Sequence, residues 1–299
     1  MQKEKHLGIL SGKLLVFGGA YSNYQALLGL KDVADSLGIP PHRVICTGDL
    51  VGYCADPDLS VQLAKNWGIE AIAGNVEVNL REDAEACGCN FDEGSRCDLF
   101  SRQWYPYAQG QLSPASWDYL HALPLYLRFQ YAGKEALVLH GAFEEISRFV
   151  FASTPWVQKA RQFALGKAEL ILAGHSGLPF AQHMGDLHWI NAGVIGMPAN
   201  DGTPRVWYVL LDDSSGTLSY QYKSLDYGHA KAQNRMRQQP LPISYAQTLE
   251  TGIWDNCEIL PPLETAAQGI PLQAQQLIQS ISPAGAGVSS LIHHPPKQP

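Results

Sequence analysis

Four residues with metal-binding side chains each follow a short apolar run of the sequence. They are Asp49, Asn75, His140 and His175. Open α/β sheets bind their ligands beyond the carboxyl ends of the strands, so we expect these side chains to meet at one rim. One carboxylate, one amide oxygen and two imidazoles form a mixed ligand set that suits Mn, Fe, Zn or Ni. Taken singly, each would be an ordinary turn or loop residue, and only the combination indicates a metal site.

Three cysteines lie close together in a glycine-bearing segment: Cys87, Cys89 and Cys97. They could bind zinc with Cys54 as a fourth ligand, they could be redox-active, or they could be reduced side chains that only pack. The spacing matches no standard zinc motif. We expect the three sulfur atoms to lie near one another. If a disulfide forms, we expect Cys97 to pair with Cys87 or Cys89, because Cys46 lies in a predicted buried strand.

Short apolar runs alternate with amphipathic stretches in the first part of the chain, and these elements would position the candidate ligands. Buried strands are predicted at 14–17, 43–46 and 69–73. Helices are predicted at 23–38 and 58–67. The second helix follows Asp56-Pro57, an N-cap residue with proline at the first helical position. This alternation predicts parallel strands joined by crossover helices.

The segment 79–111 is polar and cysteine-bearing, and we interpret it as an inserted loop with one helix. Further helices are predicted at 113–123 and 154–166, and the pattern after Tyr222 is helical to about Thr251. Further strands are predicted at 125–131, 135–139, 169–173, 180–184, 187–190, 206–211 and 217–222. The first two of these would form a hairpin around Gly133. A parallel half followed by an antiparallel half predicts two packed sheets with helices outside.

The composition excludes several classes of protein. The chain has 299 residues, of which 45% are hydrophobic, and a net charge of −7, which argues against a nucleic-acid backbone as partner. A small phosphorylated substrate remains compatible with this charge, because a metal supplies positive charge locally. Neither a signal peptide nor an apolar run long enough for a membrane span is recognisable. We therefore expect a cytoplasmic protein with reduced cysteines.

The polar stretches, in this order and at this spacing, resemble the calcineurin-like metallophosphoesterase superfamily. The resemblance is to its small bacterial phosphodiesterase and diadenosine-tetraphosphatase-like branch, and it covers about residues 14–251. It rests on the following segments: Gly48-Asp49-Leu50-Val51-Gly52-Tyr53, Gly74-Asn75, the isolated His140, Gly174-His175 and 191–198. The last reads Asn-Ala-Gly-Val-Ile-Gly-Met-Pro, where the family has Asn-Pro-Gly-Ser-Val-Gly-x-Pro.

The resemblance implies an α/β fold, a four-layer α/β/β/α sandwich of two mixed sheets flanked by helices. We expect residues 1–251 to form this metallophosphoesterase-like domain, with 79–111 as its cysteine-containing insertion. Residues 252–299 would form a C-terminal extension. From about residue 282 this extension is rich in Pro, Gly, Ala, Ser and His, a composition that predicts disorder.

The family binds two metals that share a bridging aspartate, and Asp49 stands at that position. Asn75, His140 and His175 match the remaining ligands of the second metal. The resemblance thus implies metal ligation by all four residues. It also implies catalytic roles for Asp49, Asn75 and His140.

The ligands peculiar to the family's first metal are missing. Gly19, Tyr21 and Gly177 stand where the family has Asp, His and His. Val76 stands where the family has a histidine beside the scissile phosphate, which would protonate the leaving group. We therefore expect at most one divalent or trivalent transition metal, in a site that has been remodelled.

Residues near the vacated site are candidates for contacts to phosphate or substrate: Gly19, Tyr21, Ser22, Asn23 and Cys54. Backbone amides of 18–22 would cradle the phosphate. Tyr21 is a catalytic candidate with three open roles. It could be a phenolate ligand, a hydrogen-bond donor to phosphate, or a ring that only fills the gap. Glu77 keeps an acidic position at which the family supports its ligands.

The functional prediction is a metal-dependent phosphoesterase that hydrolyses a phosphodiester or a phosphomonoester with a single metal. Two rivals use the same scaffold. One is a catalytically silent binding or regulatory protein, which the loss of the first metal's ligands and of the histidine at position 76 favours. The other is a metal-dependent enzyme with non-hydrolytic chemistry that uses a cysteine near the site.

Overall fold

Two mixed sheets form the centre of the fold. The computed structural model describes residues 3–89 and 91–282. In this part of the chain the larger sheet has the order β1-β5-β6-β7-β9-β8-β12. Its strands are β1 (Glu4–Ile9), β5 (Tyr126–Tyr131), β6 (Lys134–Val138), β7 (Leu170–Ala173), β8 (Pro179–Met184), β9 (Leu187–Ala192) and β12 (Ile278–Ser280). The pairs β5–β6 and β8–β9 are antiparallel, and the other neighbours are parallel.

The smaller sheet has the order β11-β10-β2-β3-β4 among the described residues. Its strands are β2 (Leu14–Phe17), β3 (Val44–Cys46), β4 (Glu70–Ala71), β10 (Val206–Asp212) and β11 (Ser219–Leu225). Strands β2, β3 and β4 are parallel, as the crossover helices between them require. Strand β10 runs antiparallel to both β2 and β11, so this sheet is mixed as well.

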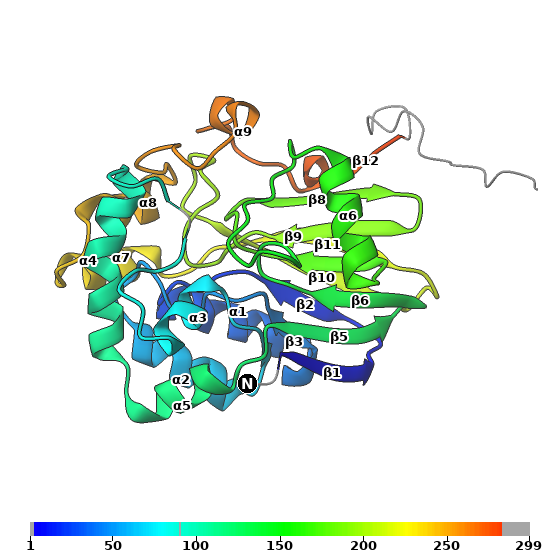
Figure 1. Cartoon of the computed structure of the whole chain (residues 1–299), viewed down its shortest axis with the longest axis horizontal. Helices are drawn as coiled ribbons and strands as arrows, with labels where there is room; N and C mark the ends of the chain where they lie inside the picture. The colour runs from blue at the N-terminus through cyan, green and yellow to red at the C-terminus, as the bar shows by residue number, and fades with distance from the viewer. Residues whose placement is uncertain (1–2, 90, 283–299) are drawn as a thin grey trace, which may run out of the picture.

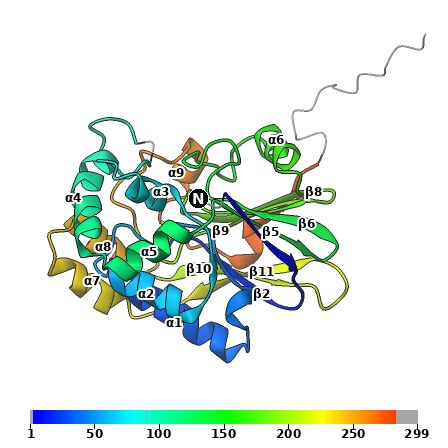
Figure 2. The same cartoon turned by 60° about the horizontal axis from the view of Figure 1, so that its bottom comes forward.

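Helices cover the outer faces of both sheets. The helices are α1 (Tyr24–Ser36), α2 (Pro57–Trp67), α3 (Asn75–Arg81), α4 (Arg96–Gln111), α5 (Pro114–Ala122), α6 (Trp156–Gly166), α7 (His229–Arg237), α8 (Ile243–Thr251) and α9 (Pro262–Ala266). In Figure 2, α6 lies above the larger sheet, and α1 and α2 lie below the smaller one. Figure 1 shows α4, α7 and α8 together beside one end of the sheets. The predicted four-layer α/β/β/α sandwich is confirmed.

The central strands are continuously apolar in sequence, since both faces of each sheet are buried. In β2, Leu14 and Val16 face the core between the two sheets. Leu15 and Phe17 face the core under the helices on the other side. Strand β7 follows the same rule, because alternate side chains of a strand point to opposite faces. The sequence pattern therefore predicted these strands correctly.

The two chain ends carry the strands that the sequence pattern missed. Strand β1 pairs with β5, and β12 pairs with β8. Both are short or polar and lack a strong alternating pattern, so tertiary pairing defines them. The predicted insertion at 79–111 contains the end of α3, a loop and α4, as expected for a loop with one helix. The predicted disorder from about residue 282 falls on 283–299, which lie outside the described residues.

The segment after α8 packs against the loop that contains Pro198 and Asn200. Trp254 donates its indole Nε1–H to the Pro198 carbonyl over 2.7 Å, and its backbone N–H donates to Asn200 Oδ1. The chain then continues through α9 to β12 at the edge of the larger sheet. None of the helices among the described residues is long and apolar enough to cross a membrane.

Gly18, just after β2 of the smaller sheet, forms an isolated parallel bridge with Val194, just after β9 of the larger sheet. A Cβ atom at Gly18 would collide with the carbonyl oxygen of Gly193. Backbone atoms cannot move aside as a flexible side chain can. Glycine at position 18 is therefore required for the two sheets to meet here.

We expect Gly18→Ala to lower the free energy of unfolding by about 1–3 kcal/mol, the usual cost of overpacking. Urea unfolding followed by circular dichroism measures this. Gly110→Ala is the matched control, because Gly110 lies in α4 with open space around its Cα and alanine is the better helix former. Equal stability of Gly18→Ala and wild type would contradict the close approach.

Candidate metal centre

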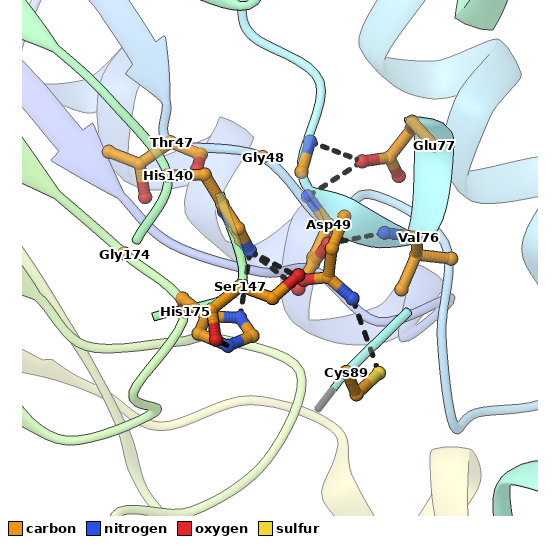
Figure 3. Close-up of polar contacts among 12 residues, drawn as sticks. Thr47, Gly48, Asp49, Val76, Glu77, Cys89, His140, Ser147, Gly174 and His175 are labelled. Carbon is orange, nitrogen blue, oxygen red and sulfur yellow. Dashed lines mark hydrogen bonds and ion pairs between the residues drawn. The ribbon is translucent and has the colours of Figure 1, made fainter. Parts of the chain in front are cut away.

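The four predicted ligands meet at the strand ends of both sheets. Asp49 follows β3 and Asn75 begins α3 just after β4, both from the smaller sheet. His140 follows β6 and His175 follows β7, both from the larger sheet. Figure 3 shows Asp49, His140 and His175 pointing toward one another. All four residues are buried.

His140 Nε2 lies at the centre of the group. It is 3.0 Å from Asn75 Oδ1, 3.1 Å from His175 Nδ1 and 3.1 Å from Asp49 Oδ2. Candidate ligand atoms of Asp49, His140 and His175 all lie within 4.8 Å of one another. These separations are those expected for ligands around a single ion.

Backbone carbonyls fix which ring nitrogen of each histidine faces the centre. His140 Nδ1 lies 2.7 Å from the Thr47 carbonyl oxygen, and His175 Nε2 lies 3.0 Å from that of Ser147. A carbonyl oxygen only accepts, so the nitrogens that face it carry the protons. His140 Nε2 and His175 Nδ1 therefore present lone pairs to the centre when the rings are neutral. Carbonyl partners of this kind commonly orient metal-binding histidines.

The side-chain amide of Asn75 is oriented in the same way. Its Nδ2 donates to the Cys87 carbonyl oxygen over 2.9 Å and to Cys89 Sγ over 3.2 Å. Its Oδ1 consequently faces His140. With neutral rings, four acceptor atoms thus converge in a buried space, an arrangement that a bound cation would stabilise. The residues present fit a metal ion.

Glu77 holds the backbone that carries two of these ligands. Its buried carboxylate accepts the N–H groups of Asp49 over 2.9 Å, Gly74 over 2.8 Å and Val51 over 3.1 Å. Burial and the nearby Asp49 carboxylate raise the pKa of Glu77 to about 7, against the opposing hydrogen bonds from Val51 and Gly74. The supporting role predicted for Glu77 agrees with these contacts.

Asp49 and His175 both have left-handed backbone conformations, with φ of 57° and 63°. A residue with a Cβ adopts this region at a cost of about 1–3 kcal/mol, and such strain is concentrated at functional sites. The hydrogen bond from the Asp49 N–H to Glu77 helps to hold this conformation. The strained backbone turns the Asp49 side chain toward the histidines.

The two histidines have different pKa values. Burial lowers the pKa of His140, but Asp49 and the Thr47 carbonyl raise it more, so the net shift is upward. Burial, followed by repulsion from His140, lowers the pKa of His175 to about 3. Without a metal, His140 is therefore the ring that takes up a proton more readily, and His175 stays neutral near neutral pH.

A pocket opens above the ligand group. Aromatic residues dominate its lining: Tyr21, Tyr53, Phe91, Phe149, Tyr245 and Trp254. Asp49 and His175 form part of its floor. The Phe149 ring stacks on His175, with ring centres 4.3 Å apart. The ligand group is thus open to a small molecule on one side.

A model of the calcineurin-like phosphoesterase superfamily domain matches residues 29–215, which is more than half of the chain. The chain belongs to the calcineurin-like phosphoesterase superfamily. An uncharacterized protein of Methanocaldococcus jannaschii is 22% identical over 261 residues, which cover 82% of this chain and all of that protein. No sequence identity of this size carries a specific activity from one protein to the other.

Two solved structures share the fold of this calcineurin-like phosphoesterase. A metallophosphoesterase from Sphaerobacter thermophilus matches with a TM-score of 0.63 and 20% identity, over 82% of this chain and 100% of that chain. A hypothetical protein from Pyrococcus horikoshii matches with a TM-score of 0.66 and 16% identity, over 81% and 99%. Both support the two-sheet architecture.

Aromatic rings fill the space beside Gly19 and Gly177. A Cβ at Gly19 would lie 2.8 Å from Cδ1 of Tyr21, so this ring fills the space of a side chain at 19. A Cβ at Gly177 would lie 3.0 Å from Cη2 of Trp254. Gly19 is therefore linked sterically to Tyr21, and Gly177 to Trp254. Burial and Tyr53 raise the pKa of Tyr21 well above its usual value, so Tyr21 is a neutral phenol.

Of the predicted substrate residues, Tyr21 lines the pocket, whereas Ser22, Asn23 and Cys54 have structural roles instead. Ser22 Oγ accepts the Gly52 N–H over 3.1 Å. Asn23 caps α1 through the Ala26 N–H and donates to the Gly196 carbonyl. Cys54 is buried, and its thiol donates to the same carbonyl. The glycine-rich stretch packs the loops together and does not reach the pocket through these side chains.

Two of the five amides predicted to cradle a phosphate at 18–22 already have partners within the protein. The Tyr21 N–H donates to the Asp49 carbonyl over 3.1 Å, and the Ser22 N–H donates to that of Leu50 over 2.9 Å. Gly19 uses its carbonyl to accept from Ile195 and Gly196. Amides that already have partners within the protein are not free to bind an anion.

The cysteine loop differs from the expected pairing. Cys87 and Cys89 form a disulfide, with Cα atoms 5.5 Å apart, while Cys97 is free. Cys97 Sγ lies 3.4 Å from Asn256 Oδ1, and Cys89 and Cys97 both line the pocket. Within residues 3–89 and 91–282, one group of three or more cysteine, histidine or acidic residues is arranged to hold a metal ion, and it consists of Asp49, His140 and His175. A zinc site with Cys54 as fourth ligand is therefore not formed.

Sequence reasoning missed Thr47, Ser147, Phe149 and Trp254. The first two act through backbone carbonyls, which any residue supplies, so their identity carries no signal. Phe149 and Trp254 reach the pocket from loops distant in sequence from the ligand motifs. Trp254 follows the region that resembles the family, and this was the one signal in the sequence that could have indicated its place in the pocket.

We expect metal binding at about pH 6.5 to release protons, because the pKa of His140 is raised in the metal-free protein and its ring must be neutral to bind a metal. Metal affinity should then fall about tenfold per pH unit below the pKa of His140. Isothermal titration calorimetry in two buffers of different ionisation enthalpy measures the released protons. Metal binding without proton release would contradict the raised pKa of His140.

Proposed function

We propose that this protein is a metal-dependent phosphoesterase that hydrolyses a phosphodiester or a phosphomonoester with a single metal ion. The observation that carries the proposal is the convergence of four buried acceptor atoms at the base of an open pocket. Membership of the calcineurin-like phosphoesterase superfamily supports phosphoester chemistry. A small phosphorylated molecule is the proposed substrate.

Asp49, Asn75, His140 and His175 would hold the ion, and Mn, Fe, Zn or Ni suits this ligand set. When bound, the metal would polarise a phosphoryl oxygen and lower the pKa of a water molecule for attack. Glu77, Thr47 and Ser147 keep the four ligands oriented through their hydrogen bonds. The restriction to one ion is supported by the rings of Tyr21 and Trp254 in the neighbouring space.

The neutral Tyr21 phenol lines the pocket and is the candidate proton donor there. Val76, by contrast, is a buried core residue with no proton to give. Because the raised pKa of Tyr21 makes the phenol a weak acid, a substrate whose leaving group needs no proton would react most readily.

A binding or regulatory protein on the same scaffold is the second candidate. The observation that favours it is the filling of the first metal's region by aromatic side chains, which removes the two-metal chemistry. Non-hydrolytic chemistry through a cysteine has less support. Cys54 does not line the pocket, and Cys89 is in a disulfide. Cys97 is free and lines the pocket, but burial raises its pKa to about 11, so it is a neutral thiol and a weak nucleophile.

We expect one transition metal per chain after purification without added metal, and faster hydrolysis of aryl than of alkyl phosphodiesters. The absent proton donor at position 76 typically contributes about 10²–10⁴-fold for a poor leaving group. Elemental analysis measures the metal. Assays with bis(4-nitrophenyl) phosphate and dimethyl phosphate under Mn, Fe, Zn and Ni measure the preference.

His140→Ala should lose both the metal and the activity, whereas His188→Ala should keep both, because His188 lies on β9 away from the pocket. If the purified protein contains no metal and hydrolyses neither class of ester, the second candidate, a binding or regulatory protein, is favoured. Equal rates on aryl and alkyl esters would show that a proton donor is present, and Tyr21→Phe would then identify or exclude the phenol.

A further inference from the structure

The pocket above the ligand group is aromatic and almost without positive charge. Among its described lining residues there is no lysine or arginine. The carboxylates that line it are Asp49 and Asp255, and Asp255 forms an ion pair with Arg96. Six aromatic rings surround this space. A ligand with several negative charges would have to leave water without a counter-charge, which is costly in such surroundings.

Four of these rings are held in place by contacts within the protein. The hydrogen bond from Trp254 Nε1 to Pro198 fixes the indole plane. Tyr21 packs edge-on against Tyr53, with ring centres 4.6 Å apart, and Tyr53 packs in the same way against Tyr245. Rigid aromatic walls bind a flat apolar group at little entropic cost.

We infer that the ligand of this pocket is a phosphodiester-type monoanion with an aromatic or apolar substituent, and that Trp254 selects this substituent. The inference rests on the proposed function. A divalent ion together with the single Asp49 carboxylate leaves one net positive charge, which matches one phosphodiester charge. The substituent would lie against the aromatic walls beside Trp254 and Phe149.

Binding of three non-hydrolysable probes to metal-loaded protein tests this inference. Methyl(phenyl)phosphinate has a ring and one charge. Dimethylphosphinate lacks the ring, and phenylphosphonate at alkaline pH has a second charge. We expect the ring to strengthen binding about 2- to 12-fold, as aromatic contacts do. The second charge should give no further gain. Calorimetry and tryptophan fluorescence measure the affinities.

Trp254→Ala should remove most of the ring preference, and Trp254→Phe should restore part of it. Circular dichroism and metal content check that both variants are folded and loaded. A ring preference that survives in Trp254→Ala, or a tenfold gain from the second charge, overturns the inference. Protein that binds no metal overturns the proposed function itself, and the two failures are therefore distinguishable.

A second inference comes from the disulfide loop Cys87-Gly88-Cys89, which contacts the supports of two ligands. The Cys87 carbonyl oxygen and Cys89 Sγ accept hydrogen bonds from the Asn75 side-chain amide. The Gly88 carbonyl accepts the Ser147 hydroxyl over 2.6 Å, and the Ser147 carbonyl accepts from His175. Figure 3 shows Cys89 and Ser147 on neighbouring sides of the ligand group. One short loop thus fixes Asn75 directly and His175 through Ser147.

We propose that this loop is a positioning element whose disulfide sets the metal affinity. Thiol–disulfide exchange with two molecules of a small thiol would transfer two electrons and two protons to the cysteines and leave the small thiol as its disulfide. The opened loop would then no longer fix the Asn75 amide. Because losing such supports typically costs 10–100-fold in metal affinity, we expect a loss of about that size on reduction.

Electron paramagnetic resonance of free Mn²⁺ measures this affinity in oxidised and reduced protein. A Cys87→Ser/Cys89→Ser variant should match the reduced protein and ignore the reductant. Cys97→Ser should respond as wild type does, because Cys97 is outside the disulfide. If the double variant does not fold, the wild-type comparison decides alone. Equal Mn²⁺ affinity before and after reduction, with loss of the disulfide verified by mass spectrometry, overturns the proposal.

Discussion

The Glu77 carboxylate, buried against three backbone N–H groups, is the interaction on which the metal centre depends. It joins the loop after β3 to the start of α3, so Asp49 and Asn75 have a fixed separation. A buried carboxylate without partners would be costly, and these amides without an acceptor would be equally so. The Glu77 carboxylate and these N–H groups satisfy one another only when both loops adopt the observed conformation. The geometry of the ligands is therefore a by-product of hydrogen-bond satisfaction in the smaller sheet.

The larger sheet contributes its ligands by a different route. His140 and His175 are oriented by carbonyl groups of Thr47 and Ser147 and by stacking with Phe149. These contacts place acceptor atoms near one another in a buried space, an arrangement that a bound cation would stabilise. The region beside the ligand group is different, because Tyr21 and Trp254 fill it with apolar surface. No cation is needed there to balance buried acceptor atoms.

The ligand group was predictable because each ligand lies at the end of an apolar strand, and strand ends meet at one rim. The four-layer fold was predictable for a related reason, since strands buried on both faces are continuously apolar. Ser22, Asn23 and Cys54 were misjudged because proximity to a ligand in sequence does not specify which way a side chain points. Trp254 and Phe149 could not be placed, since their positions depend on packing between segments far apart in the chain. The pairing of Cys87 with Cys89 likewise depends on the fold of the loop and not on spacing alone.

The chain uses its own two ends to finish the larger sheet. Strand β1 covers β5 at one edge, and β12 covers β8 at the other. An exposed edge strand is a template for pairing with other molecules, and natural proteins blunt such edges with charges or with very short strands. Here the outer strand at one edge begins Glu4-Lys5-His6, and the outer strand at the other edge has three residues. In the part of the chain that the structure describes, both outer strands are thus poor sites for strand addition, which disfavours edge-to-edge aggregation.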